Sequence, residues 1–317
     1  MRKKSRTHFL LSCTLVVSLT VGMLSGCSQS QTSEVSSQED MREQSQELKG
    51  QNEDADSNLG AWGRAMGSVL ISINDGSPYY FGGYAVTEAN QKAAANILEK
   101  SWQITSRKKL LQQIQQLLKT GSRKEYLQEA KEMNALSAKE LRKAMKQLSG
   151  SLLIHYELVQ KNWTTWGKKG LLAWDMCRIS HLVQWGYIAG YLNLEEAQAM
   201  IEPAAGKLRK QFTSWEDVIM NWLDGYALAA SVDLDEQDND YEKRRQVYLS
   251  LVEQQEQKGI LYDDMLFQTE IKPLAAVSYT SILQEIKSDK KQTQEKKNPK
   301  KVTRKKKQQK DSEESIE

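Results

Sequence analysis

Asp175 and Arg178 are the residues of this chain whose types and spacing most directly suggest chemistry. They stand three positions apart in a helical stretch, so their side chains lie on the same side of that helix. In an open cleft, the carboxylate and guanidinium would bind an anionic ligand or orient a substrate. In the interior, the same pair would fix how the helix packs, and removing one partner of a buried pair costs about 3–5 kcal/mol. The structural role is the favoured interpretation.

Glu216 is the third candidate for a catalytic role, within the run Ser214, Trp215, Glu216 and Asp217. A Ser followed by acidic residues is typical of a helix start, where they satisfy free N–H groups and complement the helix dipole. Capping is sufficient to explain Asp217, and it is the favoured explanation of Glu216.

Three aromatic residues near these positions, Trp174, Tyr187 and Trp215, are candidates for ligand binding. The chain holds eight Trp and twelve Tyr, several next to Gly, and exposed rings of this kind can stack on sugars. Aromatic residues at helical spacing also supply much of the apolar surface of a core, which is the favoured interpretation here.

Cys177 and His181 stand four apart, so their side chains can meet on one helix face. A nucleophile–base pair also needs a third, orienting group and an oxyanion site, and two ligands do not make a zinc site. The acidic loop 233–240 lacks the central Gly and the final Glu of an EF-hand. Phosphate loops, dinucleotide fingerprints and nucleophile elbows are absent from the sequence. We therefore predict no metal and no cofactor.

Helices must position these residues, because helical periodicity fills nearly all of the chain between residues 59 and 286. Helix starts are predicted at Thr87, Ser106, Ser122, Ser137, Asn193 and Ser214, several of them in capping boxes. Further helices are predicted over roughly 151–163, 169–191, 240–257 and 274–286. Only Val69–Ile73 is ambiguous between helix and strand.

The segment 169–191 is apolar nearly all round, which is typical of a buried central helix. Gly186 and Gly190, four apart, predict that a neighbouring helix approaches closely at that end. The fold prediction is an all-α, single multi-helix domain around a buried central helix.

The first 26 residues have the form of a bacterial lipoprotein signal peptide. Four basic residues precede an apolar run over Phe9–Met23, which is shorter than the roughly 20 residues of a membrane-spanning helix. Leu24-Ser25-Gly26-Cys27 resembles the lipobox of bacterial lipoproteins. That resemblance implies that Cys27 becomes the first residue and carries a diacylglyceryl group, and two acyl chains give stable anchoring. The predicted location is the cell membrane, lipid-anchored and facing outside the cytoplasm.

Two charged segments flank the predicted domain. Residues 27–58 form an acidic linker, with eight acidic against two basic residues, and residues 287–317 form a Lys-rich tail, with twelve basic against six acidic. Both have too few apolar residues to offset the entropy of ordering and are predicted to be disordered. The tail is a candidate partner of anionic lipid or cell-wall polymer, with a freely solvated tail as the alternative. Nucleic acid is not expected as a partner.

Several motifs resemble the bacterial family called domain of unknown function 1266. They are Ala173-Trp174-Asp175-x-x-Arg178, the run Gly186–Ala197, Phe212–Asp217 and Gly225-Tyr226, with Gly82-Gly83-Tyr84 and Trp102-Gln103-Ile104 upstream. The resemblance covers roughly residues 60–270 and implies a fold but no activity. Two functions stay open. The favoured one is a non-catalytic helical interaction or ligand-binding module, and the alternative is an extracytoplasmic hydrolase that uses Asp175, Arg178 and Glu216.

Overall fold

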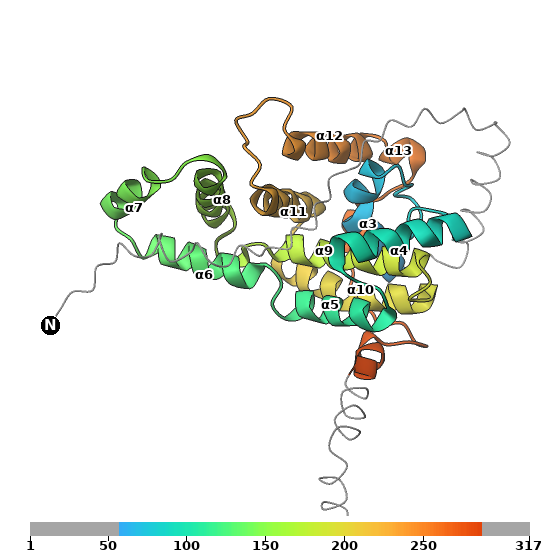
Figure 1. The fold of residues 1–317 in the computed structure, drawn as a ribbon. Coiled ribbons are helices and arrows are strands. Elements are labelled where there is room, and N and C mark those ends of the chain that lie inside the picture. The colour runs from blue at the N-terminus through green and yellow to red at the C-terminus, as the bar shows by residue number, and fades with distance from the viewer. Residues whose placement is uncertain (1–56, 287–317) are drawn as a thin grey trace, which may run out of the picture.

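The computed structural model describes residues 57–286, and every regular element in this range is a helix. In chain order the elements are α3 (Asn58–Ile73), α4 (Glu88–Trp102), α5 (Arg107–Lys119), α6 (Arg123–Asn134), α7 (Ala138–Met145), α8 (Gly150–Trp166), the 3-10 turn η2 (Gly167–Lys169), α9 (Leu172–Ile188), α10 (Leu194–Gln211), α11 (Trp215–Ala230), α12 (Asp240–Glu253), α13 (Gln255–Lys258) and α14 (Asp264–Gln268). A terminal helix begins at residue 279 and is described up to residue 286 (Figure 1). The all-α prediction is confirmed. The signal peptide, Cys27, most of the acidic linker and the Lys-rich tail lie outside the described residues.

The central helix is α9, as the apolar run predicted. It packs against α3, α4, α5, α10 and α11, and 14 of its 17 residues are buried. At Gly186 a Cβ atom would lie 2.4 Å from Leu110 Cδ2 of α5, so the predicted close approach is confirmed there. At Gly190 the prediction was wrong, because nothing lies within 4 Å of a Cβ atom. Gly190 has φ +76° instead, and it follows the end of the helix.

Side-chain caps begin most helices at the predicted residues. The side chains that accept a backbone N–H three residues further on are Thr87, Ser106, Ser137, Asn193 and Ser214. Two of them, Ser137 and Asn193, form complete capping boxes with Glu140 and Glu196. The predicted cap at Ser122 is wrong, because its side chain makes no capping hydrogen bond.

Some helix bounds differ from the sequence prediction, and one ambiguous segment is resolved. The ambiguous Val69–Ile73 is the last part of α3. The helix predicted over 240–257 is divided at Gln254 into α12 and α13. The last helix begins at 279 rather than 274, where Ser278 Oγ accepts the backbone N–H of Ser281. These differences lie at helix ends, where periodicity carries little information.

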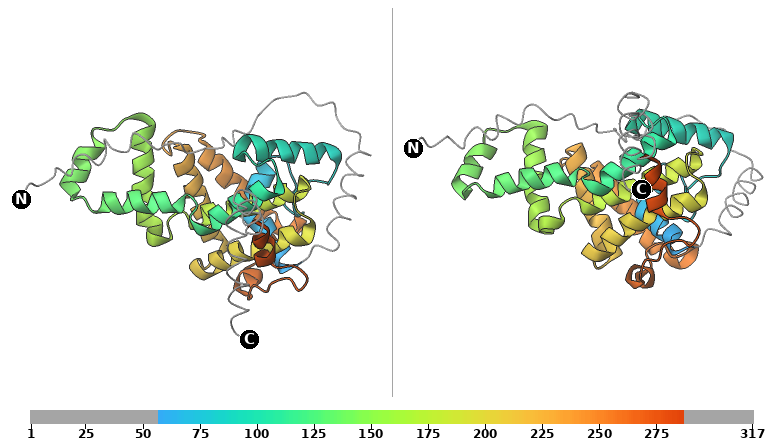
Figure 2. Two further views of the ribbon diagram at one scale, coloured as in Figure 1. Left: turned by 60° about the horizontal axis from the view of Figure 1, so that its bottom comes forward. Right: turned by 90° about the horizontal axis from the view of Figure 1, so that it is seen from below.

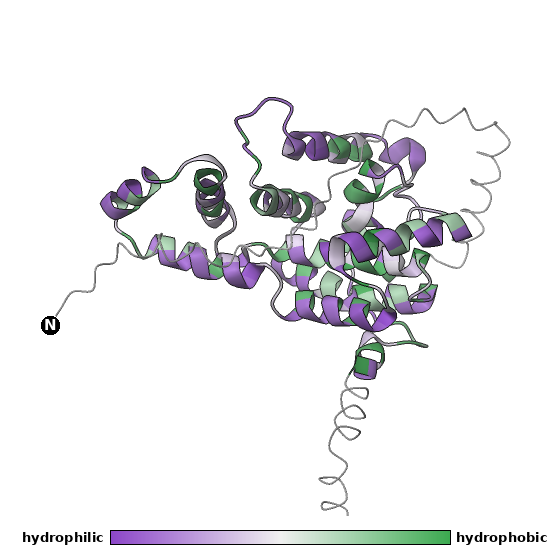
Figure 3. Cartoon of the chain, in the orientation of Figure 1, coloured by the Kyte–Doolittle hydropathy of each residue, from purple (hydrophilic) through white to green (hydrophobic). Residues whose placement is uncertain are grey.

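Helices α6, α7 and α8 form an arm that projects from the remaining helices in both views of Figure 2. Helix α6 packs against α8, whereas α7 has no buried residue. Figure 3 shows largely hydrophilic residues on α6 and α13, away from the shared core. The arm is therefore attached to the other helices mainly through α8 and the start of α6. The candidate site lies at the start of α6.

Candidate functional site

Asp175 lies in the first turn of α9 and its side chain is 0% exposed. Its Oδ1 accepts the backbone N–H of Ser122 at 2.9 Å, and its Oδ2 accepts the backbone N–H of Arg123 at 3.2 Å. The Arg123 side chain donates to Oδ2 from Nη1 at 2.7 Å. Asp175 therefore caps the start of α6 from another helix, in place of the Ser122 side chain.

Gly121 makes this contact possible. Its φ is +55°, and a Cβ atom there would lie 2.0 Å from Asp175 Oδ2. A side chain at this position would displace the carboxylate and also strain the backbone. Gly121 is thus part of the Asp175 site.

Arg178 is the second residue of this cluster. Its Nη1 lies 3.7 Å from Asp175 Oδ1 and donates to Ser122 Oγ at 3.0 Å. Its guanidinium carbon is 4.7 Å from the ring centre of Trp102 and 5.0 Å from that of Trp174. A guanidinium that lies over indole rings is stabilised by cation–π attraction. Arg178 therefore joins α4, α6 and α9.

Burial acts on both charges of this cluster. It raises the pKa of the Asp175 carboxyl, while Arg178, the Ser122 and Arg123 amides and the Arg123 guanidinium act in the opposite direction. Burial likewise lowers the pKa of Arg178, and Asp175 opposes that shift. Each charge therefore depends on its partners, which is the behaviour of a buried ion pair.

Cys177 and His181 do not form an activated pair. Burial raises the pKa of the Cys177 thiol well above its usual range. Burial, with Arg178 nearby, lowers the pKa of His181 to about 3, so the imidazole is neutral at ordinary pH. A protonated thiol is a poor nucleophile, because the thiolate is the reactive form.

Some buried nitrogen atoms near Arg178 have no hydrogen-bond partner within residues 57–286. They are Trp102 Nε1, Trp174 Nε1 and His181 Nε2. Each is a position that an ordered water molecule or a small polar ligand would satisfy.

Glu216 lies away from this cluster. Trp174 packs against Gly225, where a Cβ atom would lie 2.3 Å from Trp174 Cβ. Glu216 is nine residues before Gly225 on α11, about 13 Å along the helix axis. It is exposed in the first turn, where Ser214 caps the helix by accepting the N–H of Asp217. The structure thus joins Asp175 to Arg178 but does not bring Glu216 to them.

The three aromatic candidates occupy different surroundings. Trp174 is 7% exposed and lies beside Trp222. Trp215 is 2% exposed, donates from Nε1 to the carbonyl of Asp263 and packs on Trp62. Tyr187 is half-buried at the far end of α9, against Phe81. These residues do not line a common surface for a ligand.

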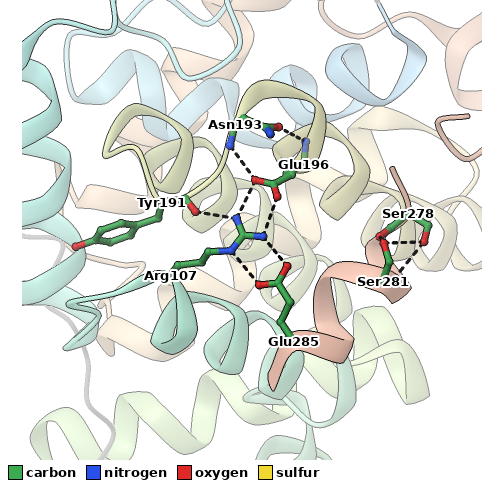
Figure 4. Close-up of polar contacts among 7 residues, drawn as sticks. All are labelled: Arg107, Tyr191, Asn193, Glu196, Ser278, Ser281 and Glu285. Atoms are coloured by element: carbon green, nitrogen blue, oxygen red, sulfur yellow. Dashed lines mark hydrogen bonds and ion pairs between the residues drawn. The ribbon is translucent and has the colours of Figure 1, made fainter. Parts of the chain in front are cut away.

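A network around Arg107 was not predicted from the sequence (Figure 4). Arg107 donates from Nη1 and Nη2 to Glu196 at 2.8 Å each, and from Nη1 to the Tyr191 carbonyl at 3.0 Å. It also donates to Glu285 of the terminal helix from Nε at 3.1 Å and from Nη2 at 2.9 Å. Hydrogen bonds to Glu285, and then to Glu196, raise the pKa of Arg107. Arg107 thus joins α5, the start of α10 and the terminal helix.

Asp224 supplies a second unpredicted network. It is buried on α11, where Oδ1 accepts Lys161 Nζ at 3.1 Å and Oδ2 accepts Trp166 Nε1 at 2.8 Å. Both donors belong to α8, so this contact attaches the arm to the core. Asp224 stands just before the Gly225-Tyr226 motif, and no sequence signal linked it to residues some 60 positions earlier.

Two hollows of the described surface are lined by none of Asp175, Arg178 and Glu216. The larger, about 570 Å³ and open, lies on α6. The smaller, about 210 Å³, includes Arg107 and Glu285 in its lining. Within residues 57–286 no group of three or more His, Cys, Asp or Glu residues is placed to hold a metal ion. No helix of the described range is long and apolar enough to cross a membrane.

Comparison with known proteins gives one match. The family described as protein of unknown function (DUF1266) matches residues 97–261. This range includes Asp175, Arg178 and Arg107 but not Glu285. No curated protein and no solved structure matches the chain.

Proposed function

The chain belongs to the DUF1266 family, and we propose that it acts as a membrane-anchored extracytoplasmic lipoprotein whose helical domain binds a ligand or partner without catalysing a reaction. The observation that carries the non-catalytic part is the engagement of Asp175. Its carboxylate is fully buried and accepts two backbone N–H groups and the Arg123 side chain. A general base needs an oxygen within about 2.6–3.2 Å of the substrate atom that carries the proton, or of a bridging water.

The hydrolase alternative required Asp175, Arg178 and Glu216 in a shared cleft. Arg178 lies against two indole rings and donates to Ser122 Oγ, and its side chain is only 16% exposed. Glu216 is exposed in the first turn of α11, about 13 Å along the helix axis from Gly225, the residue against which Trp174 packs. This arrangement favours a cluster that holds α4, α6 and α9 together over a catalytic one.

The anchor is proposed from the sequence at Cys27. The basic start, the short apolar run and Leu24-Ser25-Gly26 before Cys27 support lipidation. Ser57 caps α3 by accepting the N–H of Gly60, so the folded domain begins about 30 residues after Cys27. A chain of that length has a mean end-to-end distance of about 30 Å if it behaves as a flexible coil. The domain would then stay close to the membrane surface.

The Lys-rich tail is proposed as a second contact, with anionic lipid or cell-wall polymer. Each basic residue near an anionic surface contributes about 1 kcal/mol. Removal of residues 287–317 should weaken binding of the unlipidated chain to phosphatidylglycerol vesicles, most at low salt. Equal binding of both forms would contradict this part of the proposal.

The anchor is tested with Cys27→Ala. Cells fed an alkyne-tagged fatty acid should label the wild-type protein and not the variant, and the variant should leave the membrane fraction. Cys177→Ala is the matched control. Because the Cys177 thiol is buried, this substitution should leave the fatty-acid labelling unchanged. Unlabelled wild-type protein, or a Cys27→Ala protein that stays in the membrane as an integral protein, would overturn the anchor.

A further inference from the structure

Ile260 and Met265 are unusually exposed for their residue types. Ile260 is 67% exposed and Met265 72%, whereas the other exposed large apolar residues of the described chain are at most 40% exposed. Ile260 lies on the segment that joins α13 to α14, and Met265 lies in the first turn of α14. We call this pair the apolar edge.

The backbone of the apolar edge is held in place by buried neighbours and hydrogen bonds. Between its two residues, Leu261 and Tyr262 are buried, and both donate their backbone N–H groups to Gln255 Oε1. The Tyr262 hydroxyl is 2.6 Å from Ser68 Oγ of α3. The backbone N–H of Met265 is also satisfied, by Asp263 Oδ1 at 2.8 Å. The exposure therefore belongs to a fixed surface whose backbone groups already have partners.

The α14 end of this surface lies beside the start of α3. Phe267 of α14 packs on Trp62 in the second turn of α3, with ring centres 5.2 Å apart. Trp215 packs on both rings, at 4.4 Å from Trp62 and 5.1 Å from Phe267. Helix α14, which carries Met265, thus lies beside the second turn of α3, close to the start of the described chain at Ser57.

We propose that the apolar edge rests in the interfacial region of the bilayer that holds the lipid anchor. The inference depends on the proposed anchor at Cys27. A flexible coil of about 30 residues spans about 30 Å on average, so an anchor at Cys27 would hold the start of α3 near the membrane. A contact made by a tethered domain is effectively intramolecular. Two apolar side chains are therefore enough to hold the tethered domain on the bilayer, although they would not bind a free protein to it.

Charge near the apolar edge determines which membranes favour the contact. Asp264 is exposed next to Met265, and Asp263 is half-buried. Carboxylates are repelled by anionic headgroups, and salt screens that repulsion. The contact should therefore strengthen with added salt on anionic vesicles, opposite to the behaviour expected of the Lys-rich tail.

A fluorescent probe at Met265 tests the proposal. In the mature chain a hexahistidine tag replaces Cys27, and the protein is tethered to phosphatidylcholine vesicles that contain a nickel-chelating lipid. Met265→Cys is labelled with bimane, and Cys177 does not compete because its thiol is buried. The matched control is Leu152→Cys on α8, 40% exposed in the arm.

The expected result is quenching by brominated lipid that is about two-fold stronger at position 265 than at 152, as for side chains at the acyl boundary. Ile260→Ser should reduce the signal at 265 while leaving the melting temperature unchanged. Equal quenching at both positions, or quenching that persists with Ile260→Ser, would overturn the proposal. Because the nickel lipid replaces Cys27, failure of natural lipidation would appear only in the cell-labelling experiment.

Discussion

Replacing Asp175 by Asn tests whether this residue stabilises the fold or serves a reaction. The amide keeps one acceptor oxygen and turns the other position into a donor. Oδ1 faces the Ser122 N–H, and Oδ2 faces the Arg123 N–H and Nη1. In either orientation an amide NH₂ group would point at a donor.

The expected loss of folding free energy in Asp175→Asn follows from removal of the buried negative charge. Breaking a buried ion pair by removing one partner costs about 3–5 kcal/mol. The lower end applies here, because the side chains of Arg123 and Arg178 keep 14% and 16% exposure to water. A loss of about 3 kcal/mol is a large share of the 5–15 kcal/mol that stabilises a typical domain.

Urea unfolding followed by tryptophan fluorescence measures this loss. With a slope of about 2.5 kcal/mol per molar, the midpoint should fall by about 1.2 M. Glu216→Gln is the matched control, because it removes an exposed carboxylate from the same set of candidates. It should change the free energy of unfolding by less than about 0.5 kcal/mol.

Two results would refute the reasoning. One is an Asp175→Asn protein whose unfolding midpoint equals that of the wild type. The other is a stable Asp175→Asn protein that has lost a hydrolytic activity which the wild type possesses, since this would return Asp175 to catalysis.

Three further predictions concern the same cluster and the terminal helix. Gly121→Ala should destabilise the domain by about 2 kcal/mol or more through φ +55° and the contact with Asp175, and it should be non-additive with Asp175→Asn in a double-mutant cycle. The pKa of His181 is lowered to about 3, whereas its ordinary value is about 6.5. Between these two pH values the unfolded chain binds a proton at this imidazole that the folded chain does not bind, so stability falls as the pH falls from about 6.5 to 3. His181→Phe should remove about 2 kcal/mol of the loss between pH 7 and 5, measured by urea unfolding at each pH, and an unchanged pH dependence would contradict it. Arg107→Met should speed amide hydrogen exchange in residues 279–286 while lowering global stability by about 1 kcal/mol or less, and unchanged exchange there would show that Arg107 does not hold the terminal helix.

Local sequence information was enough for most helices. Capping residues such as Ser137 and Asn193 act on backbone N–H groups three positions away, so their effect is contained in the sequence. The apolar surface of α9 likewise predicted its central place, because a helix that is apolar all round has no side to expose. The pairing of Asp175 with Arg178 also followed from their spacing, since three residues bring two side chains to one side of a helix.

Contacts between distant segments were decided only by the tertiary structure. Ser122 has the sequence of a helix cap, yet Asp175, 53 positions away, takes that role because Gly121 lets its carboxylate reach the start of α6. Arg107 meets Glu196 and Glu285 across 89 and 178 positions, and no periodicity encodes such a meeting. The sequence by itself therefore determined the helices and the predicted anchor at Cys27. Which charged side chains are enclosed, and so which candidates serve the fold, depended on how the helices pack.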